Sequence, residues 1–213
     1  MARRRITFDN LTDTIVDSYS WRRKELKIVK DFIPNEKGPK QNASIRFAIP
    51  ILYAHWEGFV KNVTEIYLEY VANKYLNHNQ LKPQFIALSL SKHFAGAEIK
   101  NIEDKTKTIQ FLTDQLDKKS NILTKNVIQT KSNLKFSVFR EILFLIGIEE
   151  NDFIQYKSLI DDLVTFRNNI AHGEYMYVDL IAFENIYEQI EIVMNLLKTK
   201  IENSAVTESF KIA

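Results

Sequence analysis

Apolar side chains recur three and four positions apart through the longest stretches of the chain, instead of alternating with polar ones. One such stripe, between residues 52 and 70, comprises Leu52, Trp56, Phe59, Val63, Ile66 and Tyr70. This spacing gathers apolar side chains on one face of a helix, where they can be buried together. Only five glycines and four prolines occur in 213 residues, so few turns interrupt the pattern. The sequence therefore predicts an all-α protein.

Breaks in the apolar spacing and turn-forming residues divide the chain into its expected helices. These cover residues 8–33, 43–76, 83–94, 102–118, 136–146, 152–172 and 179–201. We expect Pro50 either to kink the second helix or to begin its main segment, and Gly147 to cap the helix before it. Residues 1–203 are expected to form a single domain, and residues 204–213 a loose tail.

Composition narrows the function classes. With 45% apolar and 26% charged residues the chain can bury one sizeable core, and a net charge of +2 permits an RNA partner without requiring one. The absence of cysteine excludes disulfides, thiolate zinc sites and cysteine nucleophiles. Polar residues follow the basic MARRR start, and no run approaches the 18 apolar residues of a membrane span. We expect a cytoplasmic protein with no membrane association.

One segment, residues 119–135, is rich in lysine and lacks acidic side chains. Its sequence is KSNILTKNVIQTKSNLK, with Lys119, Lys125, Lys131 and Lys135 as its cations. Such a segment can follow a phosphate backbone through electrostatic attraction. The alternative is a solvated loop, and the sequence leaves both interpretations open.

Arg167 stands out on a helical wheel of residues 152–172. The apolar side chains of that stretch fall in one broad arc formed by Tyr156, Leu159, Ile160, Leu163, Val164, Phe166, Ile170 and Ala171. Arg167 lies near the centre of this arc. Because an unpaired buried charge is costly, its guanidinium must pair with an acid, lie at a subunit interface or border a wet cleft. Glu57, which flanks the apolar stripe of the second helix, is a candidate partner.

His172 follows in the last turn of the same helix. Asn168 and His172 are four positions apart and share a face, roughly 100° or more around the helix from Arg167. Gly173 suits the left-handed conformation just past a helix end, which gives His172 a terminal position where the helix dipole favours a protonated imidazole. The simpler alternative is a helix-capping histidine.

Together these side chains have the chemistry for phosphodiester cleavage. Histidine transfers protons near neutral pH, arginine clamps a phosphate, and asparagine can orient either one. RNA supplies its own nucleophile in the 2′-hydroxyl, so this chemistry requires no metal. His55, His78 and His93 lack metal-ligand spacing, and there is no Gly-rich phosphate loop. We therefore expect no metal and no cofactor.

Two segments resemble a known family. Residues 167–173, RNNIAHG, resemble the R-x4-6-H motif of HEPN domains, and residues 53–60, YAHWEGFV, are similar to the AHWEGF segment of a stand-alone branch of HEPN ribonucleases. The resemblance implies an antiparallel helical bundle with additional helices, and a homodimer in which two motif helices face each other across a cleft. It also implies catalytic positions for Arg167, His172 and Asn168, with Glu57 and Asn169 in support.

The same resemblance implies a biological role. HEPN ribonucleases of this kind are commonly toxins or antiviral defence effectors that cut cellular RNA, often restrained by an antitoxin or another partner protein. The alternative is a HEPN-like module that binds nucleotide, RNA or a regulatory partner without cutting. The intact Arg167 and His172 favour the endoribonuclease.

Overall fold

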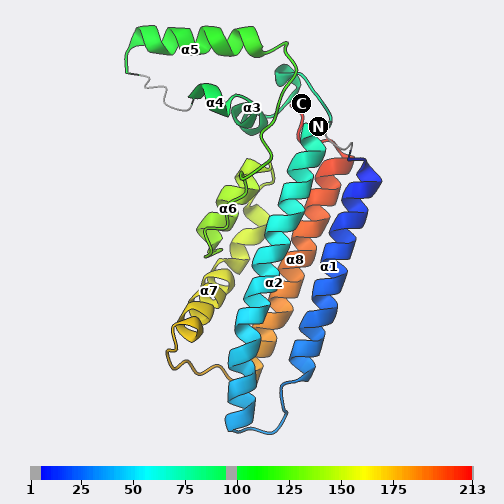
Figure 1. Ribbon diagram of the computed structural model, residues 1–213, viewed down its shortest axis with the longest axis vertical. Coiled ribbons are helices and arrows are strands. Elements are labelled where there is room, and N and C mark those ends of the chain that lie inside the picture. The colour runs from blue at the N-terminus through cyan, green and yellow to red at the C-terminus, as the bar shows by residue number, and fades with distance from the viewer. Residues whose placement is uncertain (1–5, 95–99, 213) are drawn as a thin grey trace.

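The computed structural model describes residues 6–94 and 100–212, and its regular elements are helical (Figure 1). In chain order these are α1 (Phe8–Asp31), α2 (Pro39–Ala72), the 3₁₀ helix η1 (His78–Gln80), α3 (Pro83–Ser89), α4 (Ser91–Phe94), α5 (Ile102–Gln115), α6 (Phe136–Leu145), the 3₁₀ helix η2 (Asn151–Tyr156), α7 (Lys157–Ala171) and α8 (Leu180–Val206). The described residues contain no β-strand, which confirms the all-α prediction.

Three long helices, α1, α2 and α8, lie side by side, and α7 lies against α2 on the other side (Figure 1). Successive members run in opposite directions in the order α1, α2, α7 and α8, so the bundle is antiparallel. Helix α6 packs beside α7, while α3, α4 and α5 lie at one end of the bundle. Helix α2 touches α1, α7 and α8 and carries the most buried side chains of the core, among them the fully buried Trp56 and Phe59.

The long second helix begins earlier and ends earlier than predicted. It starts at Pro39, because proline suits the first helical position, where a missing N–H leaves no hydrogen bond unmade. Pro50 lies inside the continuous helix and does not begin it. The predicted helix over 152–172 is also divided, since its first turn is the 3₁₀ helix η2 and α7 starts at Lys157.

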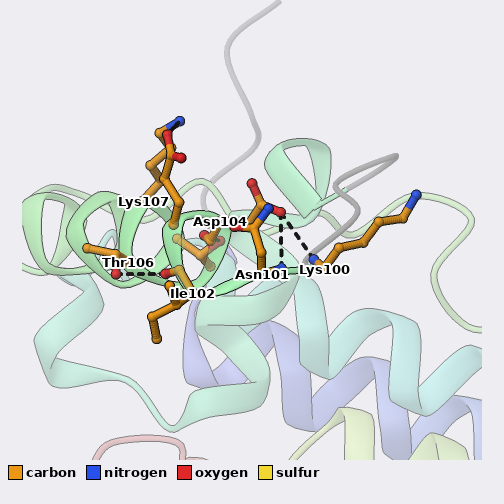
Figure 2. Close-up of polar contacts among 8 residues, drawn as sticks. Lys100, Asn101, Ile102, Asp104, Thr106 and Lys107 are labelled. Carbon is orange, nitrogen blue, oxygen red and sulfur yellow. Dashed lines mark hydrogen bonds and ion pairs between the residues drawn. The ribbon is translucent and has the colours of Figure 1, made fainter.

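Helix α5 extends away from the bundle and buries none of its residues. Its start is fixed locally. The Asn101 side chain accepts a hydrogen bond from the Asp104 amide at 2.9 Å, and the Asp104 carboxylate accepts from the Lys100 and Asn101 amides (Figure 2). Such reciprocal caps satisfy amides that have no partner within the helix.

The expectation of a loose tail is wrong for residues 204–212. Helix α8 continues to Val206, and Ser204 lies 2.7 Å from the Tyr67 hydroxyl within the bundle. Phe210 is buried against Tyr70, and the Ile212 amide donates to the Gln80 carbonyl. Single apolar side chains separated by polar residues do not form a helical repeat. The hydrophobic pattern therefore did not predict that this segment packs against the bundle.

The lysine-rich segment 119–135 contains no helix, but it is not a freely solvated loop. Ser120, Ile122 and Thr124 are buried while the residues between them are exposed, as in an extended strand lying on a surface. Ile128 and Leu134 are also buried. Within the described part of the chain, none of the helices combines the length and apolar character that a membrane-spanning segment needs.

Candidate functional site

The candidate site begins at the C-terminal end of α7. Gly173 adopts a left-handed φ of +78°, its amide donates to the Ile170 carbonyl, and the Glu174 amide donates to the Asn169 carbonyl. These two bonds form a Schellman motif, which ends the helix as predicted. His172 is the capping residue and is exposed, and among the described residues its imidazole has no hydrogen-bond partner. The ring is therefore free to approach a ligand.

Arg167 lies half-buried against an aromatic ring. Its guanidinium carbon is 4.2 Å from the centre of the Tyr53 ring of α2. One terminal nitrogen donates to the Asn168 side-chain oxygen at 2.8 Å and the other to the Ser132 carbonyl, while Nε is buried without a hydrogen-bond partner. Each acceptor that the described residues offer to this cation is uncharged.

The expected pairing of Arg167 with Glu57 is not present. No carboxylate of residues 6–94 or 100–212 lies within ion-pair distance of Arg167. One oxygen of the Glu57 carboxylate, Oε1, is buried and accepts no hydrogen bond from the described residues. Within the described part of the chain, the positive charge of Arg167 therefore lies against a ring and dipoles, with no carboxylate at ion-pair distance.

The two asparagines after Arg167 have different surroundings. Asn168 accepts from Arg167 and donates to the Asn133 side-chain oxygen at 2.9 Å, so it joins the arginine to the end of the lysine-rich segment. The Asn169 amide instead lies 4.0 Å from the Met176 sulfur, on the side of the loop that follows α7. Asn168 is therefore part of the Arg167 cluster, and Asn169 supports the turn beyond it.

Tyr53, Ser132 and Asn133 belong to this cluster but were not predicted as site residues. The Tyr53 hydroxyl accepts a 2.8 Å hydrogen bond from the Leu134 amide, which fixes the loop to α2. Burial raises the pKa of this hydroxyl above its usual value, so it stays protonated. The sequence could have indicated Tyr53 as a candidate site residue, because it precedes Glu57 by one helical turn and shares its face.

The remaining side chains of the 53–60 segment are structural. Trp56 and Phe59 are fully buried, and Gly58 lies so close to Arg22 that an added Cβ would be 3.2 Å from a guanidinium nitrogen. His55 is buried, 3.4 Å from the Glu25 carboxylate. Burial lowers the pKa of His55, an effect that Glu25 opposes and Arg22 reinforces.

Of the four lysines proposed to contact RNA, two lie beside the Arg167 cluster. Lys131 is next to Ser132 and forms a 2.6 Å ion pair with Glu141, and the Lys135 amide donates to the Asn133 carbonyl. Lys135 precedes α6 a few residues further on. Lys119 forms an isolated antiparallel β-bridge with Asn77 through the backbone, and Lys125 lines a pocket with Glu69 and Asn73. Both lysines therefore lie near the C-terminal end of α2. The structure does not gather the four lysines around one site.

An antiparallel all-α bundle with an arginine and a histidine five positions apart at the end of one helix has the features of a HEPN protein. The family model described as RiboL-PSP-HEPN matches residues 17–203, a range that includes both motif segments. The chain belongs to this family. A comparison with curated proteins and another with solved structures each gave no match. Among the described residues, no group of three His, Asp or Glu side chains is placed to hold a metal ion.

Proposed function

We propose that the protein is a metal-independent endoribonuclease. The observation that carries this proposal is the state of Arg167, a half-buried cation with uncharged acceptors only, at the same helix end as the exposed His172. A guanidinium without a counter-ion in partial burial binds an anion strongly, and a phosphodiester offers oxygens at the spacing that its fork prefers. Membership of a HEPN family supports the same function.

In the proposed reaction the 2′-hydroxyl of RNA attacks the adjacent phosphorus. The new bond joins the 2′-oxygen to phosphorus, the bond from phosphorus to the 5′-oxygen breaks, and the products are a 2′,3′-cyclic phosphate and a 5′-hydroxyl. The 2′-oxygen loses its proton and the departing 5′-oxygen gains one. His172 carries out one of these two transfers, as general base or as general acid, and solvent carries out the other. Arg167 stabilises the charge that grows on the phosphoryl oxygens, Asn168 orients Arg167, and Glu57 and Asn169 support the site from α2 and from the turn. These steps need no cofactor.

The proposal includes a homodimer, because Arg167 and His172 project from different sides of α7 and a second copy can complete the site. An exposed apolar face lies along α1 and α2 close to the site. It consists of Trp21, Ile28, Phe32, Phe47 and Ile51, which we call the α1–α2 face. The Trp21 ring contacts His55, one turn from Ile51, so the two rows are adjacent. Arg46, beside Phe47, donates to the Glu174 and Met176 carbonyls just after His172.

Incubation of the purified protein with RNA in the presence of EDTA tests the proposal. We expect fragments with 2′,3′-cyclic phosphate ends, because the reaction depends on the ribose hydroxyl. His172→Ala and Arg167→Ala should each lower the rate by about 100- to 10,000-fold, the usual contribution of a general acid or base or of one charge-stabilising donor. His172→Ala should leave the melting temperature unchanged, because the side chain is exposed. His93→Ala, at another exposed histidine, should cleave normally.

A second candidate function is a binding or regulatory module without catalysis. The observation that favours it is that Arg167 and Asn168 already contact Ser132 and Asn133, which leaves fewer donors for a substrate. Intact RNA together with tight, salt-sensitive binding would support the module and contradict the ribonuclease.

The ribonuclease would act as a toxin or antiviral effector in the cytoplasm, restrained by a partner protein. Growth arrest on induced expression of the wild type, absent for His172→Ala, would support that role. Growth without arrest in a host that lacks the partner would contradict it.

A further inference from the structure

The tip of the lysine-rich segment, residues 130–133, covers the guanidinium that the proposed function assigns to phosphate. The Ser132 carbonyl accepts from Arg167 Nη2, and the Asn133 side-chain oxygen accepts from Asn168 Nδ2. Both donors belong to the α7 motif, and both acceptors come from the tip, 35 residues earlier in the chain. The tip therefore occupies donors that a ligand would need.

The two acceptors of the tip differ from the oxygens of a phosphodiester in their charge. Both oxygens are neutral. The Ser132 carbonyl accepts from Arg167 and the Asn133 side chain accepts from Asn168, so neither of them balances the charge of Arg167. An anionic oxygen forms a stronger, charge-assisted hydrogen bond with the same donors. A phosphodiester would consequently compete well for these donors if the tip moved.

The backbone of the tip is strained between two fixed points. Lys131 and Ser132 have φ angles of 56° and 52°, a left-handed conformation that non-glycine residues adopt at a cost. Ile128 and Leu134 on either side are buried, and the Tyr53 hydroxyl holds the Leu134 amide. Because Ser132 and Asn133 are themselves exposed, the tip can leave Arg167 without disturbing the core. Opening would release the left-handed strain and lose the contacts with α7.

We propose that residues 130–133 form a displaceable plug of the Arg167 anion site. A phosphodiester oxygen of single-stranded RNA takes the place of the Ser132 carbonyl, and a second oxygen takes the place of the Asn133 side chain. The closed form of the protein binds RNA weakly, and the open form binds it tightly. This inference rests on the proposed function for the class of ligand, and it adds a built-in restraint on that site.

Binding of a short 2′-O-methyl oligonucleotide, followed by fluorescence anisotropy, tests the plug without cleavage, because the probe lacks the attacking hydroxyl. Ser132→Pro opens the tip, since proline fixes φ near −65° and cannot adopt the left-handed angle. Asn133→Ala removes the contact with Asn168 alone. We expect each variant to bind about three- to tenfold more tightly than the wild type, because apparent affinity scales with the fraction of open protein.

Asn126→Pro is the matched control. Asn126 is exposed in the same segment with a left-handed φ of 57°, and it forms no hydrogen bond with Arg167 or Asn168. Its substitution should leave the affinity for the probe unchanged. Unchanged or weaker binding by Asn133→Ala would overturn the plug, because the tip would then form part of the binding surface or have no effect. Asn133→Ala also decides the matter if Ser132→Pro fails to fold.

The plug and the ribonuclease fail in different ways. Tighter probe binding by Asn133→Ala, with no cleavage of RNA by any variant, would support the plug and refute the ribonuclease. Cleavage by the wild type, with unaltered probe binding by both tip variants, would refute the plug and support the ribonuclease.

Discussion

Arg22 and Arg167 show how this protein accommodates a guanidinium without a carboxylate. The Arg22 guanidinium lies 4.3 Å from the Trp21 ring and donates to the Ser18 carbonyl and hydroxyl, much as Arg167 lies on Tyr53 and donates to uncharged oxygens. Contacts with aromatic rings stabilise a cation by about 0.5–2 kcal/mol, less than the cost of deep burial. Burial accordingly lowers the pKa of Arg22. Of the two cations, Arg167 is the less buried.

The buried His55 should make the stability of the protein depend on pH. Burial lowers its pKa, so between the folded and unfolded pKa values the unfolded chain binds a proton that the folded chain does not. The free energy of unfolding should therefore fall as the pH drops below about 6.5, by at most about 1.4 kcal/mol per pH unit. Urea unfolding of wild type and His55→Gln between pH 5 and 7.5 measures this, and the variant should show the shallower dependence.

Glu25 provides a check on the sign of this effect. Its carboxylate raises the pKa of His55 against the effect of burial, so Glu25→Gln should make the loss of stability in acid steeper. Parallel curves for the wild type and His55→Gln would show that His55 does not cause the dependence.

The sequence was sufficient to place the candidate side chains that lie on one helix. The positions of Arg167, Asn168 and His172 on α7 and at its end could be predicted because helical spacing fixes where neighbouring side chains point, and Gly173 marked the helix end. Ser132 and Asn133 were not identifiable, because they reach α7 through loop contacts 35 positions away that follow no period. The sequence also suggested Glu57 as the ion-pair partner of Arg167. Helical spacing placed Glu57 on the expected helix but could not tell which side chains of two different helices meet, and Glu57 does not pair with Arg167.

At the scale of the elements, periodic apolar positions predicted which segments are helical better than where the helices end. The position of Pro39 decided the start of α2, and contacts outside the helix decided the extent of α8. The residues after α8 pack against the bundle through contacts of single apolar side chains. Phe210 is one of them, and its ring centre lies 6.3 Å from that of Tyr70.

Phe210→Ala should destabilise the protein by about 3–5 kcal/mol. Phe210 is 1% exposed, so its loss removes buried apolar area and leaves a cavity between α2 and the end of α8. Ile212→Ala is the control, because Ile212 is 51% exposed and its loss should cost less than about 1 kcal/mol. Urea unfolding of the three proteins measures both values. Equal stability of Phe210→Ala and the wild type would mean that this segment does not pack in solution.

At the scale of the whole molecule, the same helices contribute to the buried core and to an exposed apolar surface. Helix α2 buries its apolar side chains against α1, α7 and α8, yet it also leaves Phe47 and Ile51 exposed. Trp21 and Ile28 of the neighbouring α1, and Phe32 just after it, are exposed as well. Apolar side chains gathered on one face commonly mark a protein interface. The site lies next to this face, because Tyr53 and Arg46 connect the same part of α2 to Arg167 and to the turn after His172.

Association through the α1–α2 face can be tested with two phenylalanines of equal exposure. Phe47 and Phe144 are each 72% exposed, but Phe144 lies on α6, beside a groove lined by Ala87 and Leu88. We expect a wild-type dimer at micromolar concentration in light scattering, a monomer for Phe47→Glu because a buried carboxylate opposes association, and a dimer for Phe144→Glu. If the site is shared between copies, Phe47→Glu should also lose RNA cleavage while it retains the wild-type melting temperature. A monomeric wild type, or a dimeric Phe47→Glu, would mean that each copy must complete its site without the α1–α2 face.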